Sequence, residues 1–142
     1  MSNHIVAHLI LALALTLSAP ALAKPNRVLA DFGNKEGVFR ITEDFVSYLV
    51  TDPRIKHYFE GVDGERVTHN IAVQLCELLG GDCIYKGMSM KVAHARFKLT
   101  TADFNALVED LQKAMDKHMV PFHSQNKLLG KLAPMWKDIV TR

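Results

Sequence analysis

The stretch from Cys83 to Phe104 holds the residue whose chemistry is most informative, the histidine His94. Apolar side chains lie close to it in the sequence, among them Met90 and Phe97. An imidazole in such surroundings can ligate the metal of a flat, apolar cofactor. It can equally be a core histidine whose ring is satisfied by a hydrogen bond, because histidines are often partly buried. Both interpretations stay open on this stretch alone.

Other familiar catalytic and metal-binding motifs are absent from the sequence. The histidines after residue 24 form no H-x-x-x-H pair, and Cys76 and Cys83 lack the C-x-x-C spacing of zinc sites. No G-x-S-x-G, P-loop or G-x-G-x-x-G motif occurs. The acidic residues fall on the polar faces of the expected helices, and no carboxylate pair stands out for acid–base catalysis.

Helical periodicity runs through the chain after its first residues, and no segment shows the sustained alternation of a β-strand. Asp52-Pro53 and Gly80-Gly81 end two of the helices, and Thr100 with Asp103 forms a capping-box pattern that starts another. The fold class is therefore all-α. The spacing of apolar residues predicts helices over 34–51, 63–79, 90–97, 100–115 and 124–140, the last of them kinked at Pro134.

These parts meet the needs of a non-covalent b-type haem site. Such a site needs an axial histidine, an aromatic wall and apolar side chains on both faces of the porphyrin. The chain has candidates for each, and it lacks the C-x-x-C-H motif that attaches haem covalently.

Several short motifs then follow one another in an order and spacing typical of one family. The most specific is the run Tyr85-x-Gly87-x-x-Met90-x-x-x-His94. The others are Glu43-Asp44-Phe45, Asp52-Pro53, Tyr58-Phe59-x-Gly61, Leu79-Gly80-Gly81, Ala93-His94, Thr101 before Phe104, Val120-Pro121 and Leu132-Ala133-Pro134. Over almost all of residues 24–142 the chain thus resembles the group 1 (N-type) truncated haemoglobins. The resemblance implies a truncated globin, a two-over-two α-helical sandwich, that binds haem b and its iron without a covalent link.

The resemblance also implies roles for individual residues. His94 takes the position of the proximal ligand to the haem iron. Phe59 matches the aromatic that stacks on the porphyrin, and Phe45 matches an aromatic of the first long helix that lines the pocket. Thr68 and Lys91 are candidates near the haem propionates. The other residues expected at the haem are Val46, Val67, Ile71, Leu75, Met90, Leu99, Phe104 and Leu107.

The sequence departs from the family on the distal side of the haem. Relatives usually place Tyr directly after the pocket Phe and a polar group on the distal helix, whereas this chain has Val46, Val67 and Ile71. A hydrogen bond to a partly charged acceptor contributes about 1.5–3 kcal/mol, which is roughly ten- to a hundredfold in O₂ retention. We therefore expect an apolar distal pocket, fast O₂ release and weak discrimination against CO.

A distal histidine is the second departure. Some relatives carry, at the position of Asn70, a histidine that binds the iron as sixth ligand. Here the histidine is His69, one place earlier and about 100° around the helix. We expect His69 to face solvent, and ligation of the iron by His69 is the alternative.

The resemblance implies a haem protein that reversibly binds O₂ or another diatomic gas (NO or CO). Nitric oxide detoxification is associated with the family and would need an electron-donor reductase that the sequence does not identify. The alternative function is periplasmic electron transfer or peroxidase-like chemistry with His69 as sixth ligand. Whether the protein is an enzyme, as an NO dioxygenase or a peroxidase, stays open.

The first 23 residues are typical of a secretory signal peptide. They contain no Lys, Arg, Asp or Glu, and an apolar run over Ile5–Leu17 precedes the cleavage signature Ala21-Leu22-Ala23. This predicts a signal peptide over 1–23, a globin domain over 24–142, and a periplasmic or secreted protein. The run is shorter than the roughly 20 residues of a membrane span. The segment before it lacks Lys and Arg, however, so an uncleaved N-terminal anchor is the alternative.

Export bears on the cysteines and on the partners. Cys76 and Cys83 would form a disulfide in an oxidising compartment, the alternative being two thiols with Cys76 in the core. The 17 basic and 15 acidic residues are interspersed and give a net charge of +2, which argues against nucleic acid as a partner. We expect no membrane partner after signal cleavage, and a monomer or weak dimer.

Overall fold

The structure is a computed structural model that describes residues 26–142. The predicted signal peptide therefore lies outside the described residues. The helices are α1 (Arg27–Asp31), α2 (Asn34–Leu49), η1 (Lys56–Phe59, a 3₁₀ turn), α3 (Gly64–Leu78), α4 (Met90–His94), α5 (Thr101–Lys117), α6 (Phe122–Leu132), η2 (Ala133–Met135, 3₁₀) and α7 (Trp136–Ile139).

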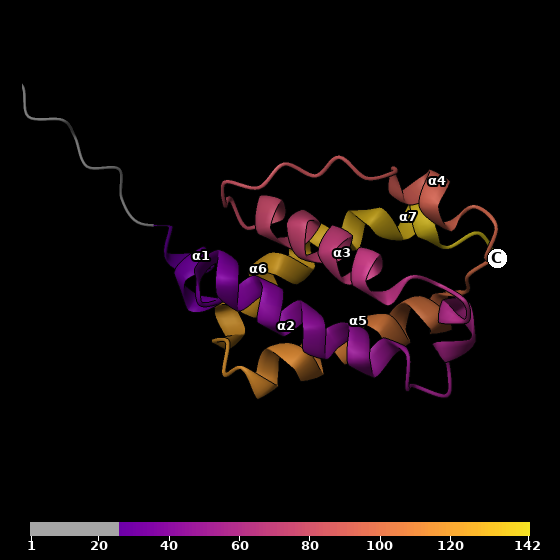
Figure 1. Cartoon of the computed structure of the whole chain (residues 1–142), viewed down its shortest axis with the longest axis horizontal. Coiled ribbons are helices and arrows are strands. Elements are labelled where there is room, and N and C mark those ends of the chain that lie inside the picture. Colours follow the sequence, from indigo (N-terminus) through magenta and orange to yellow (C-terminus); the bar gives the residue numbers. More distant parts are fainter. Residues whose placement is uncertain (1–25) are drawn as a thin grey trace, which may run out of the picture.

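The four long helices, α2, α3, α5 and α6, pack against one another. Helix α2 packs against both α3 and α5, while α6 packs against α3 and α5, and Figure 1 shows α2 and α3 crossing in front of α6. Within residues 26–142 there is no β-strand, only an isolated bridge between Leu99 and Val140. The predicted all-α two-over-two sandwich is confirmed.

Apolar stripes on these helices meet in one core. Its most buried large side chains come from α2, α5 and α6 and include Ile41, Leu49, Leu111 and Leu128. Truncating a fully buried leucine of this kind to alanine costs about 2–5 kcal/mol. This core fixes the spacing of α2, α3 and α5, which form much of the wall of the site described below.

The helix boundaries follow local chemistry. Asp63 caps α3 by accepting from the N–H of Arg66, and Thr100 and Asp103 form the predicted capping box of α5. The predicted helix over 124–140 is instead three pieces, because Pro134 lies in the 3₁₀ turn η2 between α6 and α7.

At the junction of α1 and α2, Gly33 and Asn34 both have left-handed backbone (φ 76° and 57°), a conformation that asparagine tolerates better than most residues.

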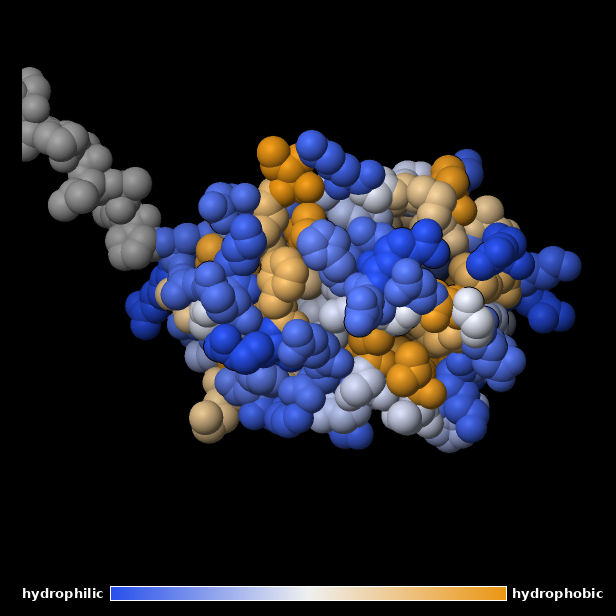
Figure 2. Space-filling model, in the orientation of Figure 1, coloured by the Kyte–Doolittle hydropathy of each residue, from blue (hydrophilic) through white to orange (hydrophobic). Residues whose placement is uncertain are grey.

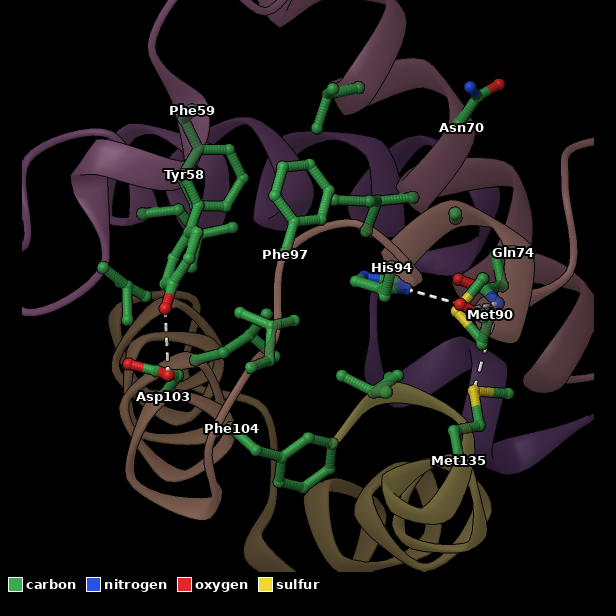
Figure 3. A pocket seen from close by; sticks show the side chains of 18 of the residues that line it. Tyr58, Phe59, Asn70, Gln74, Met90, His94, Phe97, Asp103, Phe104 and Met135 are labelled. Atoms are coloured by element: carbon green, nitrogen blue, oxygen red, sulfur yellow. Dashed lines mark hydrogen bonds between the residues drawn. The ribbon is translucent and has the colours of Figure 1, made fainter. Parts of the chain in front are cut away.

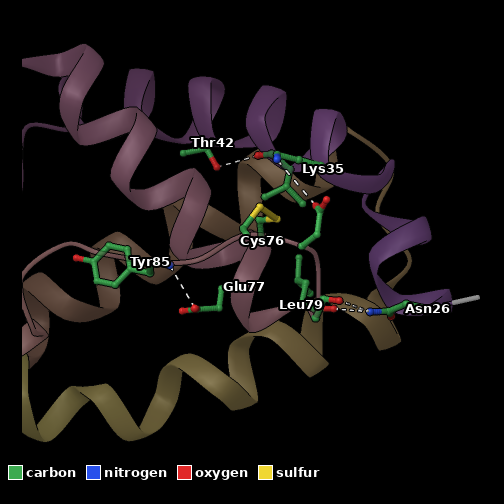
Figure 4. Close-up of a disulfide and its surroundings, with 11 residues drawn as sticks. Asn26, Lys35, Thr42, Cys76, Glu77, Leu79 and Tyr85 are labelled. Atoms are coloured by element: carbon green, nitrogen blue, oxygen red, sulfur yellow. Dashed lines mark hydrogen bonds and ion pairs between the residues drawn. A yellow bond between two sulfur atoms is a disulfide. The ribbon is translucent and has the colours of Figure 1, made fainter.

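A disulfide joins Cys76, near the end of α3, to Cys83 in the loop that leads to α4, with Cα atoms 5.8 Å apart (Figure 4). Both cysteines are buried. Position 81, between the two cysteines in the sequence, requires glycine, because a Cβ there would come within 2.6 Å of the Cys76 sulfur. The bond therefore ties the end of α3 to the loop that carries the chain to His94.

The described residues contain no helix both long and apolar enough to cross a membrane.

Asp110 on α5 is a buried carboxyl group without full hydrogen bonding. Its side chain is 7% exposed, and its Oδ2 has no partner among the described residues. Burial and the charge of nearby Asp52 raise the pKa of Asp110. The folded protein therefore binds this proton more tightly than the unfolded chain does. As the pH rises from about 3.8 through the raised pKa, ionisation of Asp110 lowers the free energy of unfolding.

We predict that Asp110→Asn increases the free energy of unfolding at pH 7 by about 1 kcal/mol, since a neutral amide removes the buried charge. Urea unfolding between pH 4 and pH 8 measures this, with Asp138→Asn as the control. The gain should shrink toward pH 4. A less stable Asp110→Asn protein at pH 7 would show that the ionised carboxylate is favourable.

Candidate functional site: the cavity at His94

A cavity of about 380 Å³ lies among α2, α3, α4, α5 and the C-terminal helices. Its volume falls within the range of small-molecule sites, about 300–1,000 Å³. Most of its wall is apolar or aromatic, and His94 points into it from α4 (Figure 3). Of the residues expected at the haem, those that line it are Phe45, Phe59, Val67, Ile71, Leu75, Met90, His94, Leu99, Phe104 and Leu107.

His94 is held by its own short helix. The Ser89 side chain caps α4 by accepting from the N–H of Val92. One turn later, His94 Nδ1 lies 2.8 Å from the backbone carbonyl oxygen of Met90. A carbonyl can only accept, so Nδ1 carries a proton, and in the neutral imidazole the lone pair is then on Nε2. Among the described residues no hydrogen bond reaches Nε2, and that nitrogen is the atom able to ligate a metal.

An aromatic wall stands on one side of this imidazole. The 3₁₀ turn η1 places Tyr58 and Phe59 in the cavity wall, and the Tyr58 ring meets Phe97 edge-on, with centroids 5.9 Å apart. Tyr58 donates from its hydroxyl to Asp103 Oδ2 at 3.1 Å. Burial, with a further contribution from Asp103, raises the pKa of Tyr58.

Asp103 keeps its negative charge in this wall. Burial acts to raise its pKa, but the hydrogen bonds that it accepts from Thr100 and Tyr58 outweigh burial, and the pKa is lowered. The tyrosine hydroxyl is thus fixed against a carboxylate at the base of α5 and is directed away from the cavity centre (Figure 3).

The wall that α3 contributes is mixed, where the sequence predicted an apolar one. Arg66, Asn70 and Gln74 line the cavity together with Val67 and Ile71. The Gln74 amide nitrogen lies 3.5 Å from the Met90 sulfur. Positions 66, 70 and 74 are four residues apart, so a polar stripe on one helix face was present in the sequence. The family pattern marks only Asn70 of these three positions, so it does not indicate the whole stripe.

Four predicted residues lie outside the cavity wall. Val46 is buried in α2, and the Thr68 hydroxyl donates to the Gly64 carbonyl at 2.8 Å. His69 and Lys91 are exposed on α3 and α4, and the His69 ring lies edge-on to Phe39, with centroids 6.1 Å apart.

The cationic side chains at the cavity are two that the sequence did not single out. Arg66 and Arg96 both line it, and the Arg96 guanidinium lies 4.9 Å from the Phe97 ring centroid. Guanidinium groups pair well with carboxylates. An open imidazole nitrogen, apolar walls and two guanidinium groups together fit a haem with its propionates.

Comparison with known proteins agrees with this geometry. The family model described as bacterial-like globin matches residues 28–141. A group 1 truncated hemoglobin of Tetrahymena pyriformis is 31% identical over 119 residues, covering 76% of this chain and 98% of the relative. The group 1 truncated hemoglobin GlbN of Mycolicibacterium paratuberculosis is 25% identical, covering 84% of this chain and 88% of the relative.

Solved structures give the same result for the fold. The crystal structure of truncated hemoglobin from Tetrahymena pyriformis in its Fe(III) form superposes with a TM-score of 0.77 at 25% identity, covering 81% of this chain and 98% of that chain. The 2/2 hemoglobin from Synechococcus superposes with a TM-score of 0.74 at 20% identity, covering 81% of this chain and 98% of that chain. The chain thus belongs to the bacterial-like globin family, and within it to the group 1 truncated haemoglobins.

Proposed function

We propose that this chain binds haem b non-covalently through His94 Nε2 and that the haem protein reversibly binds O₂ or another diatomic gas. The observation that carries the proposal is the hydrogen bond of His94 Nδ1 to the Met90 carbonyl, because in the neutral imidazole this bond leaves the lone pair on Nε2, at the cavity. Bound haem supplies an iron atom that can take a gas as ligand. Everything else in the site is supplied by this chain.

Each part of the cavity wall has a task in this proposal. The Met90 carbonyl fixes the tautomer and orientation of His94, as hydrogen-bond partners of ligating histidines generally do. Phe45, Phe59 and Phe104 exclude water from the site. Arg66 and Arg96 replace Thr68 and Lys91 as the groups that we expect at the propionates.

Haem titration tests the proposal. Purified chain freed of haem should take up one haem per chain, with a Soret band that shifts when CO is added to the reduced protein. His69→Ala is the control, since an exposed side chain outside the cavity wall should leave the spectra unchanged. Loss of a six-coordinate low-spin spectrum in His69→Ala would instead favour the electron-transfer or peroxidase-like alternative.

Ile71 tests the distal wall. We predict that Ile71→Gln slows O₂ dissociation by roughly ten- to a hundredfold, because an amide N–H at this cavity-lining position can donate to the bound gas. Ile71→Leu is the volume-matched control and should leave the rate unchanged. Stopped-flow measurement of O₂ release decides. If wild type already releases O₂ as slowly as Ile71→Gln, then Asn70, Gln74 or Arg66 already supplies the donor.

Nitric oxide detoxification ranks second to gas binding in our proposal. Converting NO and O₂ to nitrate consumes one electron per turnover, and so it needs a reductase. Steady-state NO consumption with a supplied one-electron reductant would measure whether the site turns over.

We further propose that residues 1–23 are a cleaved signal peptide and that the protein is periplasmic or secreted. The Cys76–Cys83 disulfide supports this, since such bonds persist in oxidising compartments. N-terminal sequencing of the protein isolated from its host should begin at Lys24. A start at residue 1 or 2 would favour the uncleaved anchor.

A further inference from the structure

The loop before α4 turns its apolar and basic side chains outward. Tyr85 lines the cavity, and its hydroxyl donates to the Met88 carbonyl at 2.9 Å, which folds the ring over Gly87. The neighbours of Tyr85 therefore face away from the cavity. Ile84 is 70% exposed and Lys86 is exposed, while Met88 lines the cavity but is still 62% exposed.

Helix α4 continues this surface. Met90, Ala93 and His94 face the cavity, which directs Lys91 and Val92 outward, and Val92 is 62% exposed. We call Ile84, Lys86, Met88, Lys91 and Val92 the 84–92 face. In Figure 2, orange side chains stand next to blue ones along the edge where Figure 1 places this loop and α4.

The charge of this region has one sign. Residues 83–102 contain Lys86, Lys91, Arg96 and Lys98 and no Asp or Glu. None of these four cations makes an ion pair within residues 26–142. The whole chain has a net charge of only +2, so the rest of it is net negative. The nearby Asp82 pairs with Lys35, and Glu77 accepts from the N–H of Tyr85.

We propose that the 84–92 face binds the anionic surface of a lipid bilayer, with Ile84, Met88 and Val92 entering the headgroup layer while the lysines approach the lipid phosphates. Exposed apolar side chains among unpaired cations are the pattern of surfaces that lie on anionic membranes. This departs from the expectation of no membrane partner, and it does not depend on haem.

The composition of the face favours lipid over an acidic protein. Protein interfaces are depleted in lysine and enriched in arginine and aromatic residues, whereas both cations of the 84–92 face, Lys86 and Lys91, are lysines. The apolar side chains are aliphatic or thioether groups. Each is mostly exposed, as insertion into headgroups requires.

Co-sedimentation with lipid vesicles tests the proposal. The holoprotein is mixed with phosphatidylcholine vesicles with or without one-third phosphatidylglycerol. Since residues 5–17 are themselves apolar, a chain that begins at Lys24 is measured beside the full chain. Ile84→Ser/Val92→Ser and Lys86→Gln/Lys91→Gln should each weaken binding to anionic vesicles by about tenfold or more, and phosphatidylcholine alone should bind weakly.

Matched controls come from remote surfaces. Met119→Ser/Phe122→Ser removes two side chains that are 87% and 69% exposed at the turn between α5 and α6, and Lys127→Gln/Lys131→Gln removes two exposed cations of α6. Both should bind vesicles as wild type does. An unchanged Soret band in Ile84→Ser/Val92→Ser would show an intact haem site.

Three results would overturn the proposal: wild type that ignores anionic vesicles, equal weakening by the control pairs, or binding to polyglutamate without binding to vesicles.

Discussion

Replacing His94 with glycine is expected to weaken haem binding by more than about a hundredfold. Loss of a group that merely orients a metal ligand typically costs ten- to a hundredfold in affinity, and His94 Nε2 is the proposed ligand itself. The cavity left by the side chain should admit free imidazole. Millimolar imidazole should therefore restore the Soret band of His94→Gly, as measured by haem titration in its presence and absence.

His118→Ala is the control for this substitution. His118 is also partly buried, and its Nε2 lies 2.7 Å from Asp44 Oδ2, but it is not part of the cavity wall. It should keep wild-type haem affinity. If His94→Gly bound haem as wild type does, or if imidazole had no effect, another residue would have to hold the iron.

Removing the disulfide is the second large expected effect. Cys76→Ala/Cys83→Ala should lower the free energy of unfolding by about 2–3 kcal/mol in the chain-entropy model, because the bond closes a short loop in the unfolded chain. The bond also ties α3 to the loop that leads to His94, so haem should dissociate faster from the variant. Urea unfolding and haem transfer to an acceptor globin measure the two effects.

Unfolding with and without a thiol reductant separates the stability that the disulfide bond contributes from the stability that the packing of its sulfurs contributes. Both cysteines are buried, so alanine also removes core contacts. A thiol reductant should lower the stability of wild type and leave the variant unchanged. Wild type that unfolds at the same urea concentration with and without reductant would show that the bond contributes nothing.

The sequence carried much of the fold because its signals are local. The capping box at Thr100 and Asp103, the cap at Asp63 and the glycines after Leu79 depend on hydrogen bonds within a few residues. The disulfide required distance information, and the structure supplies it. Pro134 was expected to kink one helix, but the structure has two helices, α6 and α7, on either side of it. Proline has no backbone N–H to donate, and Pro134 lies in the first turn of η2, where that N–H is not needed.

The distal wall was harder to predict, because it depends on how α3 is rotated about its axis. Arg66, Asn70 and Gln74 reach the cavity, whereas His69 faces solvent beside Phe39. Neighbouring residues on a helix differ by about 100°. The family positions include Val67, Asn70 and Ile71, but they do not include Arg66 or Gln74. Only the packing of α3 on α2 decides which residues share the cavity.

The measurement that tests the central claim most directly is the absorption spectrum of the purified chain in its ferric, ferrous and CO-bound states. A haem held by His94 with no ligand from His69 predicts a five-coordinate high-spin ferrous spectrum and a shifted, sharpened Soret band with CO. Absence of a Soret band after expression with haem available would contradict the proposal that this chain binds haem. A ferrous low-spin spectrum would contradict the assignment of the distal side.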